Sequence, residues 1–128
     1  MTLKERLAEL DKLEYYLRGK EIAYERVDRC EISDEEINRL IEAGYCDIKA
    51  KESIKERFSR HQIAIPAVGA DNWEWDAICH NGSYGYEEGL LEVMGDPVVR
   101  KEDGDSVKGF LTADDVIQRL EEYYAKTK

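Results

Sequence analysis

The sequence predicts an α+β fold in which a small antiparallel sheet packs against several helices. Apolar residues recur at helical spacing in some segments and alternate with polar residues in others. Short turns separate neighbouring strand-like segments, which is typical of antiparallel pairing, and the segments do not repeat a strand–helix–strand unit. No linker or internal repeat divides the 128 residues, so we expect a single domain over residues 1–128.

The first helix is expected over residues 2–18. Thr2 and Glu5 have the spacing of a capping box, in which each side chain bonds to the backbone amide of the other residue. One apolar stripe follows at helical spacing. It consists of Leu3, Leu7, Leu10, Leu13 and Leu17. Gly19 is a typical helix end, and the alternation over residues 21–28 then predicts a strand.

Two further helices are predicted before the next strands. Ser33 and Glu36 form a second capping box, and the helix that they begin is expected to reach Gly44. Another helix is expected over residues 47–60 and contains the one basic concentration of the chain. Its basic residues are Lys49, Lys51, Lys55, Arg57 and Arg60. We interpret them as a solvated helix face that balances acidic neighbours.

An antiparallel hairpin is predicted from residues 61–68 and 73–80, with its turn at 69–72. The second strand alternates strictly, so its side chains divide between two faces of the sheet. One face would carry Trp73, Trp75, Ala77 and Cys79, and the other Glu74, Asp76, Ile78 and His80. We expect the two tryptophans to point to the helices and fill the core.

The C-terminal third is predicted to contain two helices and a small hairpin. Residues 85–94 have the pattern of a helix, and the Val98–Val99 pair could form a hairpin with residues 107–110. Thr112 and Asp115 have a capping-box-like spacing at the start of the last helix. Its expected buried face consists of Val116, Ile117, Leu120, Tyr123 and Tyr124.

The composition narrows the function classes. Hydrophobic residues make up 42% of the chain, which favours a folded protein, and the net charge of −10 disfavours direct binding to nucleic acid or to an anionic membrane. No apolar run is long enough to span a bilayer, and no apolar signal segment follows Met1. Three irregularly spaced cysteines fit a reducing compartment. We therefore expect a cytoplasmic protein without a membrane partner.

The acidic residues gather in clusters along the sequence. One cluster includes Asp34, Glu35 and Glu36, and another consists of Glu87, Glu88 and Glu92. The general interpretation is solubility, because acidic proteins repel one another. The specific interpretation is a surface that imitates a phosphate backbone and occupies the basic groove of a partner protein.

Cys79, His80 and His61 are the candidates for catalytic chemistry. A cysteine nucleophile needs a base within hydrogen-bonding distance, but neighbouring residues on a strand point to opposite faces, so Cys79 and His80 should diverge. His61 could approach Cys79 across the predicted hairpin. No cysteine or histidine spacing resembles a zinc site, and no cofactor-binding motif is present, so we expect neither a metal nor a cofactor.

The loop from Gly82 to Tyr86 opens the predicted helix at 85–94. Backbone amides at a helix start can bind anions, but Glu87 and Glu88 would repel a phosphate placed there. The glycines are therefore interpreted as turn residues. Tyr84 and Tyr86 could form an aromatic contact surface, since tyrosine is common at the centre of interfaces.

The second half of the sequence resembles small uncharacterised proteins of bacterial phages and mobile elements. The resemblance lies in Trp75–His80, the following Gly-Ser-Tyr-Gly-Tyr loop up to Glu92, and Gly109–Ile117. It implies no catalytic residues. In size, acidity and order of elements the chain also resembles anti-CRISPR inhibitors, which block a nuclease by occupying its nucleic-acid groove. This second resemblance concerns the layout and includes no motif.

These observations predict a non-enzymatic interaction protein, an inhibitor or adaptor, that docks a basic surface of a protein partner. The expected contact residues are Asp34, Glu35, Glu36, Tyr84, Tyr86, Glu87, Glu88 and Glu92. The most specific form of this expectation is an inhibitor of a bacterial defence nuclease. One alternative is a small enzyme or ligand-binding domain centred on Cys79, His80 and His61. Another is a structural subunit that dimerises through its leucine-rich first helix.

Overall fold

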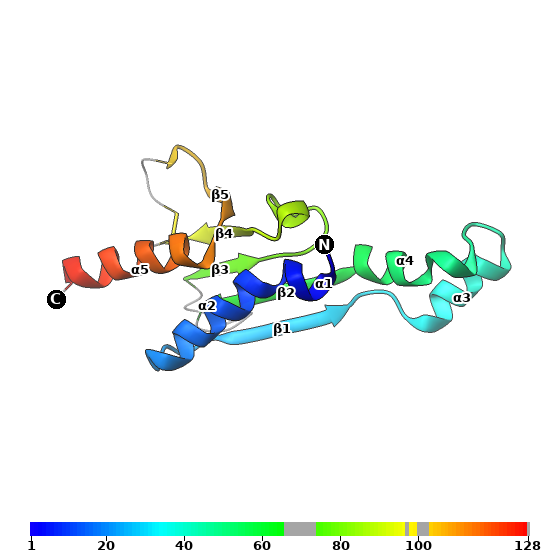
Figure 1. Ribbon diagram of the computed structural model, residues 1–128, viewed down its shortest axis with the longest axis horizontal. Coiled ribbons are helices and arrows are strands. Elements are labelled where there is room, and N and C mark those ends of the chain that lie inside the picture. Colours follow the sequence, from blue (N-terminus) through cyan, green and yellow to red (C-terminus); the bar gives the residue numbers. More distant parts are fainter. Residues whose placement is uncertain (66–73, 97, 100–102, 128) are drawn as a thin grey trace.

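A five-stranded antiparallel sheet forms the centre of the protein in the computed structural model (Figure 1), which describes residues 1–65, 74–96, 98–99 and 103–127. The strands lie in their sequence order, β1-β2-β3-β4-β5. Their bounds are Glu25–Cys30 (β1), Ser59–Ile65 (β2), Trp75–Ile78 (β3), Leu91–Gly95 (β4) and Val107–Leu111 (β5). The predicted α+β fold, with an antiparallel sheet and helices in a single domain, is confirmed.

Three helices lie against the sheet: α1 (Leu3–Arg6), α2 (Ala8–Gly19) and α5 (Ala113–Thr127). They are seen together in front of the strands in Figure 1. The helix predicted over residues 2–18 is present as α1 and α2, which meet at Leu7. Its capping box is confirmed, because Thr2 and Glu5 exchange side-chain-to-backbone hydrogen bonds.

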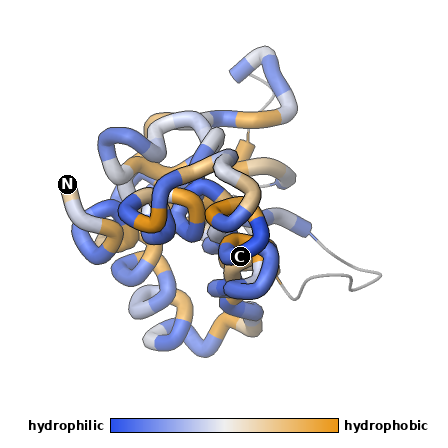
Figure 2. The backbone as a smooth tube through the Cα atoms, turned by 90° about the vertical axis from the view of Figure 1, so that its right-hand side faces the viewer, coloured by the Kyte–Doolittle hydropathy of each residue, from blue (hydrophilic) through white to orange (hydrophobic). Residues whose placement is uncertain are grey.

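The hydrophobic core lies between these helices and the sheet. Leu10, Leu13 and Leu17 of α2 are completely buried against strand residues such as Trp75 and Val93. Hydrophobic and hydrophilic stretches alternate along the helical turns (Figure 2), as amphipathic helices require. Because the buried leucines of α2 contribute to the core of their own chain, they cannot form the dimer surface that the structural-subunit hypothesis needs.

A helical arm, here defined as residues 31–58, projects beyond the sheet (Figure 1). It contains α3 (Asp34–Glu42), the short 3-10 helix η1 (Ile48–Ala50) and α4 (Lys51–Arg57), and it connects β1 to β2. Ser33 caps α3 as predicted, since its hydroxyl accepts from the Glu36 amide at 3.1 Å. The helix expected over 47–60 ends earlier because Ser59 and Arg60 belong to β2 and pair with β1.

The predicted hairpin is confirmed where the structure describes it. β2 and β3 pair antiparallel with Ile63 opposite Ala77, and Trp75 is buried in the core as expected. The turn at 69–72 and Trp73 lie outside the described residues. The strand expected over 21–28 starts later, at Glu25. The amides of Glu21 and Ile22 donate to the carbonyls of Arg18 and Leu17, so these two residues belong to the turn that ends α2.

The prediction of a helix over residues 85–94 is wrong. A single 3-10 turn, η2 (Tyr86–Glu88), lies between Gly85 and Gly89, which both have left-handed backbone conformations. Such conformations favour glycine and interrupt a helix. The following residues instead form β4, in which Val93 pairs with Ala77 of β3. Sheet pairing and burial of alternate residues outweigh the local helical pattern here.

The hairpin predicted between Val98–Val99 and residues 107–110 is also wrong. β5 pairs with β4, with Leu111 opposite Leu91, while Val98 is buried in the core. The start of α5 is as predicted, because Thr112 and Asp115 exchange capping hydrogen bonds. The predicted burial of its apolar face is confirmed for Val116 and Leu120, which are fully buried, and is wrong for Tyr123, which is exposed.

Candidate interaction surface

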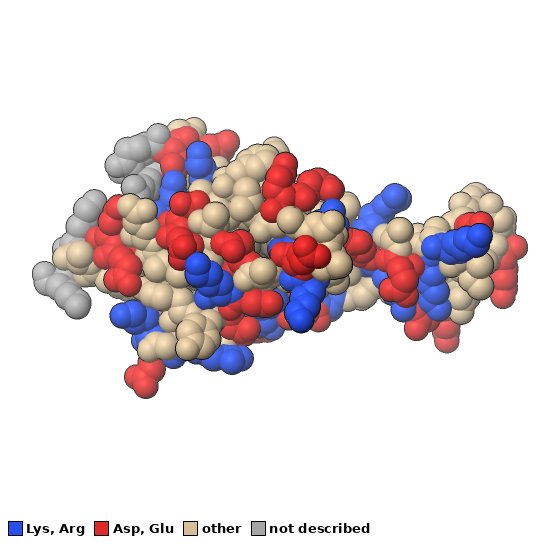
Figure 3. All heavy atoms as spheres, viewed as in Figure 1, with Lys and Arg blue, Asp and Glu red and all other residues tan. Residues whose placement is uncertain are grey.

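The structure places the two predicted acidic clusters on different parts of the molecule. Asp34, Glu35 and Glu36 form the first turn of α3 on the arm, whereas Glu87 and Glu88 belong to η2 between β3 and β4 (Figure 1). Figure 3 shows acidic and basic side chains interspersed over the face in view. The expected contact residues therefore do not form one continuous acidic face.

Basic neighbours neutralise the cluster on the arm. The Asp34 carboxylate is 3.0 Å from Lys55 Nζ and 3.9 Å from Lys51 Nζ. The hydrogen bond from Lys55 lowers the pKa of Asp34. Glu35 lies 3.9 Å from a guanidinium nitrogen of Arg39. The interpretation of the α4 lysines as balancing charges is thus confirmed for Lys51 and Lys55.

Glu36 is bonded within the arm, because its carboxylate accepts from the Ser33 hydroxyl at 3.3 Å. All three acidic residues are exposed, but each one already has a local partner. Basic side chains pair with Asp34 and Glu35, whereas Glu36 keeps its negative charge because its partner is a neutral hydroxyl.

Tyr86 is not the exposed anchor that the sequence predicted. Its side chain is only 3% exposed, and its hydroxyl donates to the Glu56 carboxylate of α4 at 2.6 Å. The Arg6 guanidinium lies 5.0 Å from the centre of its ring and bonds to the same carboxylate. Burial, together with the bond to Glu56, raises the pKa of Tyr86 to about 12. Tyr86 therefore joins the loop before β4 to the arm.

Glu92 also has a structural role in this loop. Its carboxylate accepts a hydrogen bond from the Tyr84 amide at 3.0 Å. The Ser83 hydroxyl donates to the His80 carbonyl at 2.7 Å and closes the turn on the other side. These bonds hold the backbone of residues 80–84, so that the Tyr84 side chain, 62% exposed, extends into solvent.

Phe110 of β5 lies beside Tyr84. The Phe110 amide donates to the Tyr84 carbonyl at 3.3 Å, and a Cβ atom at Gly109 would collide with the Tyr84 side chain. The glycine is thus required for the loop to approach β5. Phe110 itself has a φ of 59° and is 57% exposed. The sequence analysis missed this residue, for which the preceding glycine was the only signal.

A left-handed conformation is costly for a residue with a side chain, about 1–3 kcal/mol. At Phe110 it coincides with a solvent-exposed aromatic ring and an irregularity in the β4–β5 register. Strained positions of this kind concentrate at binding sites. We define the acidic–aromatic surface as Tyr84, Phe110, Glu87 and Glu88. Glu88 is exposed, and Glu87 is also exposed but lies 3.4 Å from Arg6.

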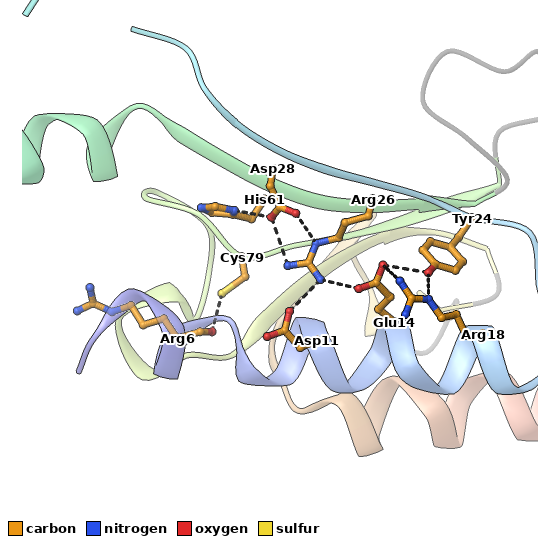
Figure 4. Close-up of polar contacts among 9 residues, drawn as sticks. All are labelled: Arg6, Asp11, Glu14, Arg18, Tyr24, Arg26, Asp28, His61 and Cys79. Carbon is orange, nitrogen blue, oxygen red and sulfur yellow. Dashed lines mark hydrogen bonds and ion pairs between the residues drawn. The ribbon is translucent and has the colours of Figure 1, made fainter. Parts of the chain in front are cut away.

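The alternative site around Cys79 is buried. Cys79 is completely inaccessible, and its thiol donates to the Arg6 carbonyl at 3.3 Å (Figure 4). Burial raises the pKa of the thiol to about 11. A nucleophilic cysteine needs the thiolate form and access for a substrate. The thiol of Cys79 has neither property in this structure.

The two histidines do lie next to Cys79, as the hairpin register requires. His61 is opposite Cys79, whose amide donates to the His61 carbonyl at 3.1 Å. The His61 Nδ1 atom, however, is 2.7 Å from the Asp28 carboxylate (Figure 4). His80 Nδ1 accepts from the His61 amide at 3.4 Å, and burial lowers the pKa of His80. None of these contacts engages the thiol.

Charged side chains at the edge of this region connect β1 to α2, with Arg26 and Glu14 partly buried and Asp28 and Asp11 exposed. Arg26 lies 3.0 Å from both the Asp28 and the Asp11 carboxylates and 3.4 Å from that of Glu14. Burial alone would raise the pKa of Asp28, but the hydrogen bonds from His61 and Arg26 lower it. This network was not predicted from the sequence, and its contacts are those of a structural ion-pair cluster.

Within the described part of the chain, no three His, Cys, Asp or Glu side chains are placed to hold a metal ion. No helix among the described residues combines the length and apolar character that crossing a bilayer requires. In comparisons with protein-family models, curated proteins and solved structures, nothing matches this chain.

Proposed function

We propose that this protein is a non-enzymatic interaction protein that docks a basic surface of a protein partner through its acidic–aromatic surface. The observation that carries the proposal is the exposed, strained Phe110 beside the exposed Tyr84. A protein gains nothing in its own core from such a pair. The geometry is useful when a partner covers the two rings.

The residues of this surface supply complementary contributions to binding. Tyrosine and phenylalanine rings are rigid anchors that bury a large apolar area at low cost in conformational entropy. The carboxylates of Glu87 and Glu88 would attract a basic rim around the anchor pocket. Charge complementarity of this kind accelerates association and selects the partner. The net charge of −10 adds long-range attraction to any basic protein.

The buried Cys79 thiol supports a non-enzymatic role over the alternative of an enzyme centred on Cys79, His80 and His61. Inhibition of a bacterial defence nuclease is the most specific form of the proposal. In that form the acidic–aromatic surface would cover part of the basic groove. The paired charges of the arm argue against a long phosphate-like array.

A charge-matched pair of variants tests the proposal. The immobilised wild-type protein, the Glu87→Lys/Glu88→Lys variant and the Glu35→Lys/Glu36→Lys variant are each exposed to a lysate of the native host. Captured proteins are quantified by mass spectrometry at low and at raised ionic strength. We expect the wild-type protein to capture a basic protein at low salt and to release it at raised salt. The Glu87→Lys/Glu88→Lys variant should no longer capture this protein, whereas the Glu35→Lys/Glu36→Lys variant should still capture it. Equal capture by all three proteins would refute the proposal.

A further inference from the structure

We propose that β1 is a homodimer interface through which two copies of this chain join their sheets edge to edge. β1 is the first strand in the sheet order, so β2 is its only neighbour among the described strands. Figure 1 shows β1 along one border of the sheet, with the arm following its Cys30 end. The β1 edge is separate from the acidic–aromatic surface, and pairing through β1 does not depend on that surface.

The sheet register determines which backbone groups of β1 face outward. The carbonyls of His61 and Ile65 accept from residues on the β3 side, so the groups of Gln62 point to β1. Gln62 lies opposite Val27. Hence Glu25, Val27 and Arg29 bond to β2, whereas the N–H and C=O groups of Arg26 and Asp28 point away from the sheet. No backbone hydrogen bond within the described residues reaches these outward groups.

An exposed edge of this kind can pair with another strand. Charged residues on an edge normally oppose such pairing, but the order of charges in β1 is self-complementary. Read from Glu25 to Arg29, the charges are negative, positive, neutral, negative and positive. When two copies pair antiparallel about Val27, Glu25 lies opposite the partner's Arg29, and Arg26 lies opposite the partner's Asp28. Opposite charges at facing positions stabilise an antiparallel pair.

The neighbouring registers place like charges together. Two β1 strands can form backbone hydrogen bonds only in a register that places outward-pointing N–H and C=O groups of one strand opposite those of the other. A pairing centred on Arg26 would place it opposite the partner's Arg26, and one centred on Asp28 would place it opposite the partner's Asp28. The register about Val27 is therefore favoured over both alternatives. In this register Arg26 and the partner's Asp28 exchange backbone hydrogen bonds, and Val27 packs on the partner's Val27.

The charged side chains of β1 divide between the two faces of the sheet. The side chains of Arg26 and Asp28 point to the helix side, where they contact Asp11 and His61, respectively. Glu25 and Arg29 are exposed on the opposite face of the sheet. Because the paired strands run in opposite directions, the two arms would extend from opposite ends of the pair.

The first test is the concentration dependence of the mass of the purified protein, measured by sedimentation equilibrium. We expect a reversible monomer–dimer equilibrium. Glu25→Arg introduces two like-charge contacts per dimer and should weaken dimerisation about tenfold. Arg29→Glu should have the same effect, whereas a mixture of the two variants should form heterodimers because opposite charges then face each other. Glu42→Arg, on the arm, is the charge-matched control and should leave the equilibrium unchanged.

The second test locates the twofold axis by crosslinking. In a background in which Cys30 and Cys46 are serine, Val27→Cys places two thiols at a non-hydrogen-bonded pair, where the Cα atoms are about 4.5 Å apart. This distance suits a disulfide, so mild oxidation should give a covalent dimer. The control Arg29→Cys separates the two thiols by four strand residues, about 13 Å, and should not crosslink.

Circular dichroism is used to check that each variant is folded. A wild-type protein that stays monomeric at all concentrations would overturn the inference. So would a wild-type dimer that neither crosslinks through Val27→Cys nor forms the charge-swapped heterodimer, because its interface would then lie elsewhere.

Discussion

The Tyr86 hydroxyl donates a hydrogen bond to the Glu56 carboxylate at 2.6 Å, and this contact connects the loop before β4 to α4 of the arm. The two residues are 30 positions apart in the sequence. Arg6 of α1 completes the contact, because its guanidinium bonds to Glu56 at 2.6 Å and lies over the Tyr86 ring. Three separate parts of the chain therefore meet where the arm leaves the sheet.

Replacing Tyr86 with phenylalanine should lower the free energy of unfolding by about 1 kcal/mol. The ring stays buried, but Glu56 loses a hydrogen bond that is charge-assisted and partly exposed to solvent. Chemical denaturation at pH 7 measures the change. Tyr84→Phe, at the exposed tyrosine of the same loop, is the matched control and should change the stability by much less. An equal loss in both variants would contradict the assigned role of Tyr86.

Acid should weaken the same contact. Hydrogen bonding to Tyr86 and Arg6 lowers the pKa of Glu56 below its usual 4.5. A carboxylate with a lowered pKa stabilises the folded state above its unfolded pKa, and this contribution disappears as the pH falls through the folded value. The free energy of unfolding should thus decrease below about pH 4.5, and the decrease should be smaller in Glu56→Gln. Parallel pH profiles of the two proteins would show that Glu56 does not contribute.

Phe110→Gly should raise the free energy of unfolding by about 1 kcal/mol. A left-handed backbone costs a residue with a side chain about 1–3 kcal/mol, and glycine avoids most of this cost at the expense of a more flexible unfolded chain. The same substitution removes an exposed ring of the acidic–aromatic surface, so partner capture should fall. Thermal and chemical denaturation measure the first effect. A clear loss of stability would mean that the ring packs within its own chain.

Cys79 should react very slowly with thiol reagents in the native protein. Its raised pKa, about 11 against an ordinary 9.0, leaves roughly a hundredfold less thiolate at neutral pH, and its burial excludes the reagent. In a Cys30→Ser/Cys46→Ser variant, alkylation of the remaining thiol is followed with and without denaturant. We expect modification only after unfolding. Rapid reaction of the folded protein would restore the hypothesis of a cysteine nucleophile.

Local patterns were sufficient for much of the fold. The capping boxes at Thr2, Ser33 and Thr112 begin helices in the structure, since the bonds that define them join residues three positions apart. The alternation around Trp75 predicted which side chains enter the core. Helix starts and the alternation of a strand can be predicted from the sequence, because they depend on residues only a few positions apart.

Residues 85–94 show where local patterns fail. Their apolar spacing fits a helix, but Leu91 and Val93 gain more by pairing with β3 and β5 and by burial in the core. Local patterns also failed to predict which residues of the candidate site are exposed. Tyr84 and Tyr86 are close in the sequence, yet one is exposed and the other is buried against the arm.

The amino-acid sequence by itself determined the composition, the acidic net charge, the starts of three helices and the charge order of β1, because each is a property of neighbouring residues. Only the tertiary structure decided that Asp34 pairs with Lys55, that Tyr86 bonds to Glu56, that Cys79 is inaccessible and that Phe110 lies beside Tyr84. These relationships depend on strand order and helix placement. The energies that select them come from contacts between residues distant in the chain, which no local pattern contains.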